Sequence, residues 1–321
     1  MAWGQSKWLR PKVRIAKLAQ DGLFLSDDGR PIFSEPWMEE QIWAPFERMD
    51  PKDNGTYYNR LGWVYPTGEG KTLQLAMLTI YHCLFSCVDT PRVILAAGSK
   101  EQAKHIKSYI KRFILRSPPL LKIFNVQKDI IIQKDDTPCK NMCGRKHGRS
   151  EIKVVSSESS LQHGEPRITL RVFDELWNQK NYNLISALKM RPRRVCKEGK
   201  TCFIGYPLCP EEKDVPMFDW VNQMLPDSDK RKDRRYKGNL FPRGWLVWRQ
   251  SLLKDPIQAG LATHQASWWQ REDLQRDHDE MMPFQFASMH CGRWSAGSEA
   301  MFGEEWEETQ NKALEYERLT A

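Results

Sequence analysis

Apolar and polar residues follow each other along the chain in blocks that predict alternating strands and helices. The apolar run at 61–65, LGWVY, predicts a buried strand, and residues 72–87 form a long block of helical character without Gly or Pro. Residues 91–98 predict a second strand, and a basic amphipathic helix follows from Ser99, with Gln102 in the capping-box position. Strands that alternate with helices favour a mostly parallel sheet with helices on both faces.

The pattern continues with further strands and changes character near residue 210. Short apolar or β-branched blocks predict strands at 130–133, 151–158, 168–177 and 200–208, with a short helix at 181–190. Beyond residue 210, charged residues and Trp become frequent and the strand patterns weaken. We therefore expect a core domain over residues 1–210 and a smaller helical and irregular subdomain over residues 211–321.

The composition is that of a globular, basic protein. Hydrophobic residues make up 40% and charged residues 28%, which excludes a disordered chain. The formal charge of +8 favours a polyanion such as nucleic acid as partner, although it fits a merely basic protein equally well. No apolar run approaches the roughly 20 residues of a membrane span, and the N-terminus lacks an apolar secretory core. These features predict a reducing interior compartment.

Eight cysteines fit that compartment as free thiols. One group, Cys139, Cys143 and His147, has a spacing that suits part of a zinc site. A fourth ligand must come from elsewhere, with Cys196 or Cys202 as loose possibilities. A polar insertion loop without metal is the favoured interpretation.

The stretch YPTGEGKT, residues 65–72, nearly matches the phosphate-binding pattern G-x-x-x-x-G-K-[ST], with Tyr65 in place of the first Gly. Such a loop needs backbone N–H groups that face phosphates and lead into a helix, and the predicted strand and helix on its two sides meet that need. Lys71 would bridge the β- and γ-phosphates, and the hydroxyl of Thr72 would bind Mg²⁺. The residues expected to contact a nucleotide are Thr67, Gly68, Glu69, Gly70, Lys71 and Thr72.

Two acids end the predicted strand at 168–177, and we expect this strand to lie beside the loop strand. Asp174 would hold Mg²⁺ through water, and Glu175 would orient and deprotonate the attacking water. The alternative is a strand that ends in two solvated acids. Upstream of the loop, the amide of Gln41 can donate and accept at once and so can pair with an adenine edge. A surface Gln on an amphipathic helix is the equally weighted alternative.

These segments, in this order, resemble the ATPase domain of the large terminase subunit, the DNA-packaging motor of tailed phages. PWMEEQIWAPF, residues 36–46, looks like the family's adenine motif, and residues 65–72 look like its phosphate loop, which often lacks the first Gly. Residues 159–177 are similar to the region that carries the acids, and the likeness covers roughly residues 35–310. It implies a P-loop NTPase fold of the ASCE or RecA-like type, with ATP as substrate and Mg²⁺ as cofactor.

Two positions depart from the family pattern. The coupling motif is usually Thr-Thr-Ala-Gly or similar, whereas this chain has CFIG at 202–205, with Thr201 as a possible substitute hydroxyl. His163 stands before Gly164 where many terminases carry Arg. An arginine finger from a neighbouring subunit is then expected from Arg191, or else from Arg167, Arg193 or Arg194.

The resemblance also implies partners and a location. They are double-stranded DNA, further copies of the chain in a ring, a portal protein and a small terminase subunit, in the host cytoplasm and away from membranes. A full large terminase continues into a nuclease that this chain lacks, so we expect no DNA cleavage and read Asp219, Asp227 and Asp233 as solvated. Two other functions stay open, a superfamily 2 helicase-like motor and a catalytically inactive nucleotide- or DNA-binding scaffold.

Overall fold

The computed structural model describes most of the chain between residues 12 and 296. The described ranges are 12–49, 57–86, 90–128, 130–134, 149–156, 168–178, 182–188, 199–209, 216–224, 244–251, 253–293 and 295–296.

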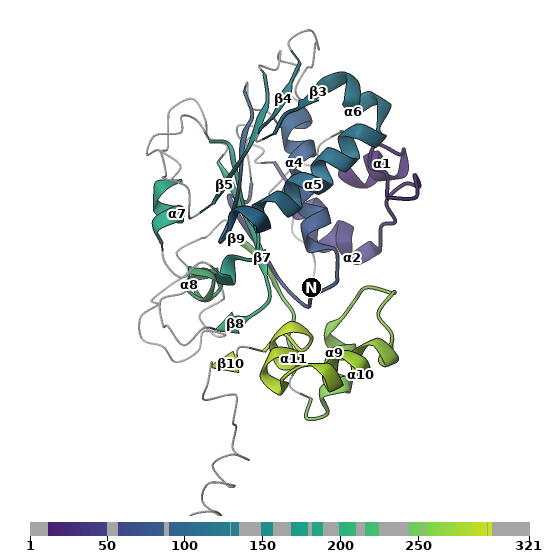
Figure 1. The fold of residues 1–321 in the computed structure, drawn as a ribbon, viewed down its shortest axis with the longest axis vertical. Helices are drawn as coiled ribbons and strands as arrows, with labels where there is room; N and C mark the ends of the chain where they lie inside the picture. The colour runs from purple at the N-terminus through teal and green to yellow at the C-terminus, as the bar shows by residue number, and fades with distance from the viewer. Residues whose placement is uncertain are drawn as a thin grey trace, which may run out of the picture.

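An eight-stranded, mostly parallel sheet organises these residues (Figure 1). Its parallel strands, in spatial order, are β5 (Glu151–Ser156), β2 (Arg92–Ala97), β6 (Leu170–Phe173), β7 (Lys200–Gly205), β1 (Arg60–Val64) and β9 (Gly244–Trp248). Two antiparallel strands extend the edge beyond β5, namely β4 (Ile130–Gln133) and β3 (Phe124–Val126). The mostly parallel sheet agrees with the alternating pattern of the sequence.

The loop strand and the acid-bearing strand are not neighbours, which corrects one expectation. β7 lies between β1 and β6 and pairs with both in parallel. Because parallel strands end at the same edge, the loop after β1 and the acids after β6 still reach one edge of the sheet. The sequence distance between loop and acids carries no information on the strand that separates them.

Helices cover both faces of the sheet, as predicted (Figure 1). Alternate strand residues supply the two cores, because successive side chains of a strand point to opposite faces. On one face, α4 (Lys71–Phe85) and α5 (Lys100–Arg116) pack over Trp63 and Leu95. On the other, α7 (Asn183–Ala187) and α8 (Pro216–Met224) pack over a core that includes Phe173, Phe203 and Trp220.

Short helices complete the first face. They are α1 (Ile15–Gln20), α2 (Pro36–Met38), the π-helical turn η1 (Glu39–Trp43), α3 (Ala44–Glu47) and α6 (Pro118–Ile123). Their buried apolar residues, among them Ile15, Ile42 and Phe46, join the same core as α4. The expected start of α5 is confirmed, since Ser99 Oγ accepts a hydrogen bond from the Gln102 N–H at 3.2 Å.

The C-terminal part divides differently from the expected boundary at residue 210. α8 and β9 belong to the main sheet. A separate small core forms among α9 (Pro256–Thr263), α10 (Arg271–Glu280) and α11 (Pro283–Met289), which Figure 1 shows grouped at one end of the sheet. The remaining elements are the turn η2 (Leu176–Asn178) and a parallel pair, β8 (Leu208–Cys209) with β10 (Ser295–Ala296).

Two absences hold for the described residues alone. None of their helices combines the length and apolar character needed to cross a bilayer. Within the same residues, no group of three or more His, Cys, Asp or Glu side chains is arranged to hold a metal. The zinc candidates Cys139, Cys143 and His147, with Cys196, lie outside them. Cys202 is a free, buried thiol in β7.

Candidate nucleotide-binding site

The loop at residues 65–70 joins β1 to α4 and has the backbone that a phosphate-binding loop needs. Gly68 and Gly70 both have φ of +72°, in the left-handed region that favours glycine. Gly70 directly precedes α4, a helix of 15 residues whose N-terminal N–H groups carry a partial positive charge. Tyr65 needs no such freedom, because it continues the extended chain of β1 and packs its buried ring edge-on against Trp37. The first Gly of the usual pattern is therefore dispensable here.

Lys71 holds its charge inside this loop. Its side chain is 6% exposed, and Nζ donates to the carbonyl oxygens of Tyr65 at 2.9 Å and Pro66 at 2.6 Å. Burial lowers the pKa of Lys71, while the neighbouring carboxylates, Glu175 foremost, oppose the shift. Phosphate oxygens offer an ammonium group stronger acceptors than these two carbonyls. The arrangement therefore suits exchange of carbonyl contacts for phosphate contacts.

Asp174 and Thr72 meet beside Lys71. Asp174 follows β6, is 4% exposed and accepts a hydrogen bond from the Thr72 side chain. Burial raises the pKa of Asp174 to about 7, with Glu175 adding to the rise and Lys71 opposing it. Asp174 Oδ1 is buried without a hydrogen-bond partner in the part of the chain that the structure describes. A buried carboxylate oxygen that still needs a partner, next to a hydroxyl, fits the oxygen ligands that Mg²⁺ prefers.

Glu175 stands in a backbone conformation that L-residues rarely adopt. Its φ is +47°, and it is the sole non-glycine residue with positive φ in the described ranges. The indole N–H of Trp177 donates to Glu175 Oε2 and fixes the direction of the carboxylate. Strained residues of this kind cluster at functional sites, where surrounding contacts maintain them. Glu175 is also close enough to influence the pKa of both Lys71 and Asp174.

The C-terminal helices touch the loop directly. The N–H of Thr67 donates to the carbonyl of Met289 in α11 at 2.9 Å. The Trp268 indole N–H donates to the Gly68 carbonyl at 3.0 Å. A Cβ on Gly68 would lie 2.5 Å from Trp269 Cζ2, so the chain approaches too closely for any other residue there. The loop is thus held between the sheet and the helical group α9–α11.

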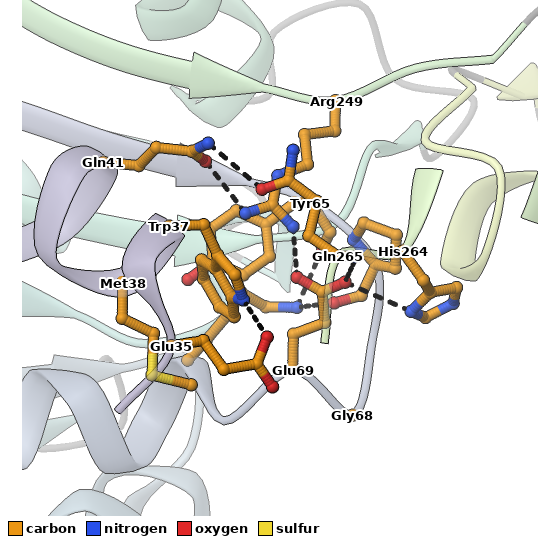
Figure 2. A network of polar contacts seen from close by, with 12 residues as sticks. Glu35, Trp37, Met38, Gln41, Tyr65, Gly68, Glu69, Arg249, His264 and Gln265 are labelled. Atoms are coloured by element: carbon orange, nitrogen blue, oxygen red, sulfur yellow. Dashed lines mark hydrogen bonds and ion pairs between the residues drawn. The ribbon is translucent and has the colours of Figure 1, made fainter. Parts of the chain in front are cut away.

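Glu69 is the centre of a buried polar network that ties the loop to the chain after β9 (Figure 2). It is fully buried and forms an ion pair with Arg249, which directly follows β9. Glu69 Oε1 accepts from the Gln265 N–H at 2.8 Å and lies 3.3 Å from His264 Nδ1. Burial opposes these contacts, yet His264 and Arg249 together hold the pKa of Glu69 below its ordinary value. A buried charge of this kind is tolerated only when it is paired.

Gln41 is part of the same network, which changes its predicted environment. It lies on the π-helical turn η1, an irregularity often found at functional sites. Its Oε1 accepts from Arg249 Nη2 at 2.9 Å, and its Nε2 donates to Gln265 Oε1 at 3.1 Å. Figure 2 shows both partners converging on the amide from the side of Glu69. The amide is therefore oriented towards the phosphate loop, although it is engaged by the chain's own residues.

Several other predicted residues differ from expectation or lie outside the described part. Thr201 pairs with Arg60 at the start of β1, the end opposite to the loop, and its hydroxyl accepts from Arg171 at 2.7 Å. It therefore does not replace the hydroxyl of the coupling motif. Asp219, expected to be solvated, accepts from the Tyr182 hydroxyl at 2.6 Å. Residues outside the described ranges are His163, Gly164, Arg167, Arg191, Arg193, Arg194, Asp227 and Asp233.

Sequence reasoning missed Arg249, His264 and Gln265. The segment GWLVWRQ, residues 244–250, contains a strand followed by a cation, which is the available signal for Arg249. No local pattern marks His264 or Gln265, because their role comes from contact with Glu69 nearly 200 residues away.

Comparison with known proteins identifies the fold. No family model and no curated protein matches the chain. The HK97 bacteriophage large terminase matches with a TM-score of 0.64 and 16% identity, over 87% of this chain and 54% of that one. The large terminase ATPase domain of Thermus phage P74-26 gives 0.48 and 13%, over 82% and 98%. The large terminase of a thermophilic bacteriophage, in complex with ADP, gives 0.48 and 9%, over 74% and 48%.

The chain spans about half the length of the HK97 large terminase, at an identity that supports a statement about fold alone. The mostly parallel sheet with helices on both faces is the arrangement that the resemblance implies. The chain therefore has the P-loop NTPase-like fold of a phage large terminase ATPase domain, as predicted from its sequence.

Proposed function

We propose that this chain is the ATP-hydrolysing motor of a viral DNA-packaging terminase, which couples hydrolysis to movement of double-stranded DNA into a procapsid. The observation that carries the proposal is the meeting of Lys71, Thr72 and Asp174 at one edge of the sheet, with an unpartnered buried oxygen on Asp174. The fold shared with the HK97 large terminase supports it.

Binding of ATP uses the loop and its helix. N–H groups of residues 67–72 face the phosphates, and Lys71 exchanges its two carbonyl partners for β- and γ-phosphate oxygens. Thr72 and Asp174 hold Mg²⁺, Asp174 through water. The ion, when bound, neutralises charge on the phosphates. Because Asp174 must be ionised for this role, binding of the ion is favoured above about pH 7.

Hydrolysis needs a base that accepts a proton from water. Water oxygen bonds to the γ-phosphorus, the bond from that phosphorus to the bridging oxygen breaks, and ADP leaves with inorganic phosphate. Glu175 takes the proton from the attacking water, and Trp177 maintains the direction of the carboxylate. Lys71 stabilises the charge on the phosphate oxygens from one side.

The other side of the γ-phosphate requires a further cation. No Arg lies between Tyr65 and Thr72, so we assign this role to an arginine of a neighbouring copy in a ring, with Arg191 as the candidate. The +8 charge attracts DNA phosphates without base readout. The portal protein and the small terminase subunit are the further partners in this proposal, and the host cytoplasm is the location.

Substitution of the proposed base tests the proposal. Glu175→Gln is expected to bind ATP as the parent does and to lose turnover by about 10²-fold or more. Lys71→Ala is expected to lose both. Glu272→Gln, an exposed acid on α10, is the matched control and should keep the parent rate. Hydrolysis by Glu175→Gln at the parent rate would refute the assignment.

A further inference from the structure

The orientation of the Gln41 amide is fixed by its neighbour. Arg249 has only donors, so the atom that faces Arg249 Nη2 at 2.9 Å must be the carbonyl oxygen of Gln41. The amide nitrogen then faces Gln265 Oε1, at 3.1 Å. Arg249 and Gln265 are themselves held side by side, because the two oxygens of Glu69 bind the Arg249 guanidinium and the Gln265 N–H (Figure 2).

This pair of contacts has the hydrogen-bonding pattern of an adenine edge. Adenine presents a donor at N6 and an acceptor at N7. Arg249 presents a donor to Gln41, and Gln265 presents an acceptor to it. We propose that Gln265 occupies the place of the adenine acceptor, so that a nucleotide base must displace the Gln265 side chain before it pairs with Gln41. This inference rests on the proposed function, since it takes ATP as the ligand.

Gln265 is the partner that can leave. Its residue is exposed, and its backbone N–H, which binds Glu69 at 2.8 Å, stays in place when the side chain rotates into solvent. Arg249 is 9% exposed, ion-paired with Glu69 and centred 4.5 Å from the rings of both Trp37 and Tyr65. It does not have to move, because the carbonyl oxygen of Gln41 has a second lone pair for adenine N6–H.

Gln265 therefore lowers the affinity for adenine nucleotides and not for the phosphate chain. Guanine gains nothing from its removal, because guanine carries the acceptor O6 where adenine carries a donor, and Gln41 Oε1 cannot donate. A residue with a merely structural role would affect ATP, GTP and tripolyphosphate alike. Gln265 is thus a specificity-determining residue of the proposed site.

Equilibrium binding with matched ligands tests the inference. Gln265→Ala keeps the N–H that binds Glu69 and removes only the competing carbonyl. Its Kd for Mg·ATP is expected to fall about threefold to tenfold, the worth of one net hydrogen bond. The Kd values for Mg·GTP and Mg·tripolyphosphate should not change. Gln275→Ala, an exposed Gln on α10, is the control and should change none of the three.

A second variant separates competition from other effects. In the Gln41→Ala background, Gln265→Ala should give no gain for ATP, because the amide that both ligands share is gone. Weaker or unchanged ATP binding by Gln265→Ala, or an equal shift for tripolyphosphate, would overturn the inference while leaving the proposed function intact. Failure of the unaltered chain to bind Mg·ATP or Mg·tripolyphosphate would overturn both.

Discussion

Asp174→Asn is expected to stabilise the fold while it destroys turnover. Burial and the nearby Glu175 raise the pKa of Asp174 from 3.8 to about 7. A rise of about 3 units corresponds to about 4 kcal/mol of cost for the ionised form, at 1.36 kcal/mol per unit. A buried Asn amide with unmet hydrogen bonds returns about 1–3 kcal/mol of that cost. We expect a net gain of about 1–3 kcal/mol at about pH 8.

The sign of the pH dependence follows from the direction of the shift. A raised pKa means that the folded chain binds the proton more tightly than the unfolded chain, so this stabilisation is present at low pH and is lost as pH rises through about 7. Near pH 5.5 Asp174 is protonated, and the advantage of Asn should vanish. At about 2 °C or more per kcal/mol, Tm should rise by about 2–6 °C at pH 8.

Thermal unfolding with a chelator at both pH values measures this difference. Asp21→Asn, at an exposed carboxylate paired with Lys17, is the control and should show no pH-dependent gain. Added Mg²⁺ should raise the Tm of the parent at pH 8 and leave Asp174→Asn unchanged. Equal Tm changes at the two pH values, or a lower Tm for the variant at pH 8, would refute the reasoning.

Three further outcomes are expected. Gly62→Ala places a Cβ 2.2 Å from Phe203 Cζ, so thermal or denaturant unfolding should show a loss of about 1–3 kcal/mol, and unchanged stability would contradict this packing. Affinity for duplex DNA of any sequence should fall steeply between about 50 and 200 mM salt, and a flat response would exclude a grip through phosphates. ATPase activity per chain should rise with concentration, and excess Lys71→Ala chains should rescue Arg191→Ala by donating a finger worth about 10³–10⁵ in rate. Constant specific activity without rescue would show that each chain completes its own site.

Local patterns were sufficient to predict the elements that hold the loop and acids. LGWVY is apolar over a full strand, the glycines follow at once, and α4 runs for 15 residues without Gly or Pro. The start of α5 was predictable because both halves of its cap lie within four residues, Ser99 and Gln102. Such features depend on neighbours in the sequence, which is why they are readable before any tertiary contact is known.

Features that depend on distant contacts were not readable. β9 has an intermediate burial pattern and no clear alternation, so its place beside β1 follows from pairing and not from composition. The insertion of β7 between β1 and β6 is a matter of topology, which sequence order does not determine. The partners of Gln41 and Glu69 come from residues 249–265, and a chemically ordinary Gln or His gives no sign of such partners in advance.

The Glu69–Arg249 ion pair has a consequence for how related sequences diverge. The two residues lie 180 positions apart and are both buried, so a change at one leaves an uncompensated charge in the interior, at a cost of about 3–5 kcal/mol. Replacement of both by neutral residues of similar size avoids that cost. Homologous chains should therefore carry either both charges or neither at these two positions. A set of relatives in which Glu69 is kept and the position of Arg249 varies freely would show that the pair imposes no such constraint.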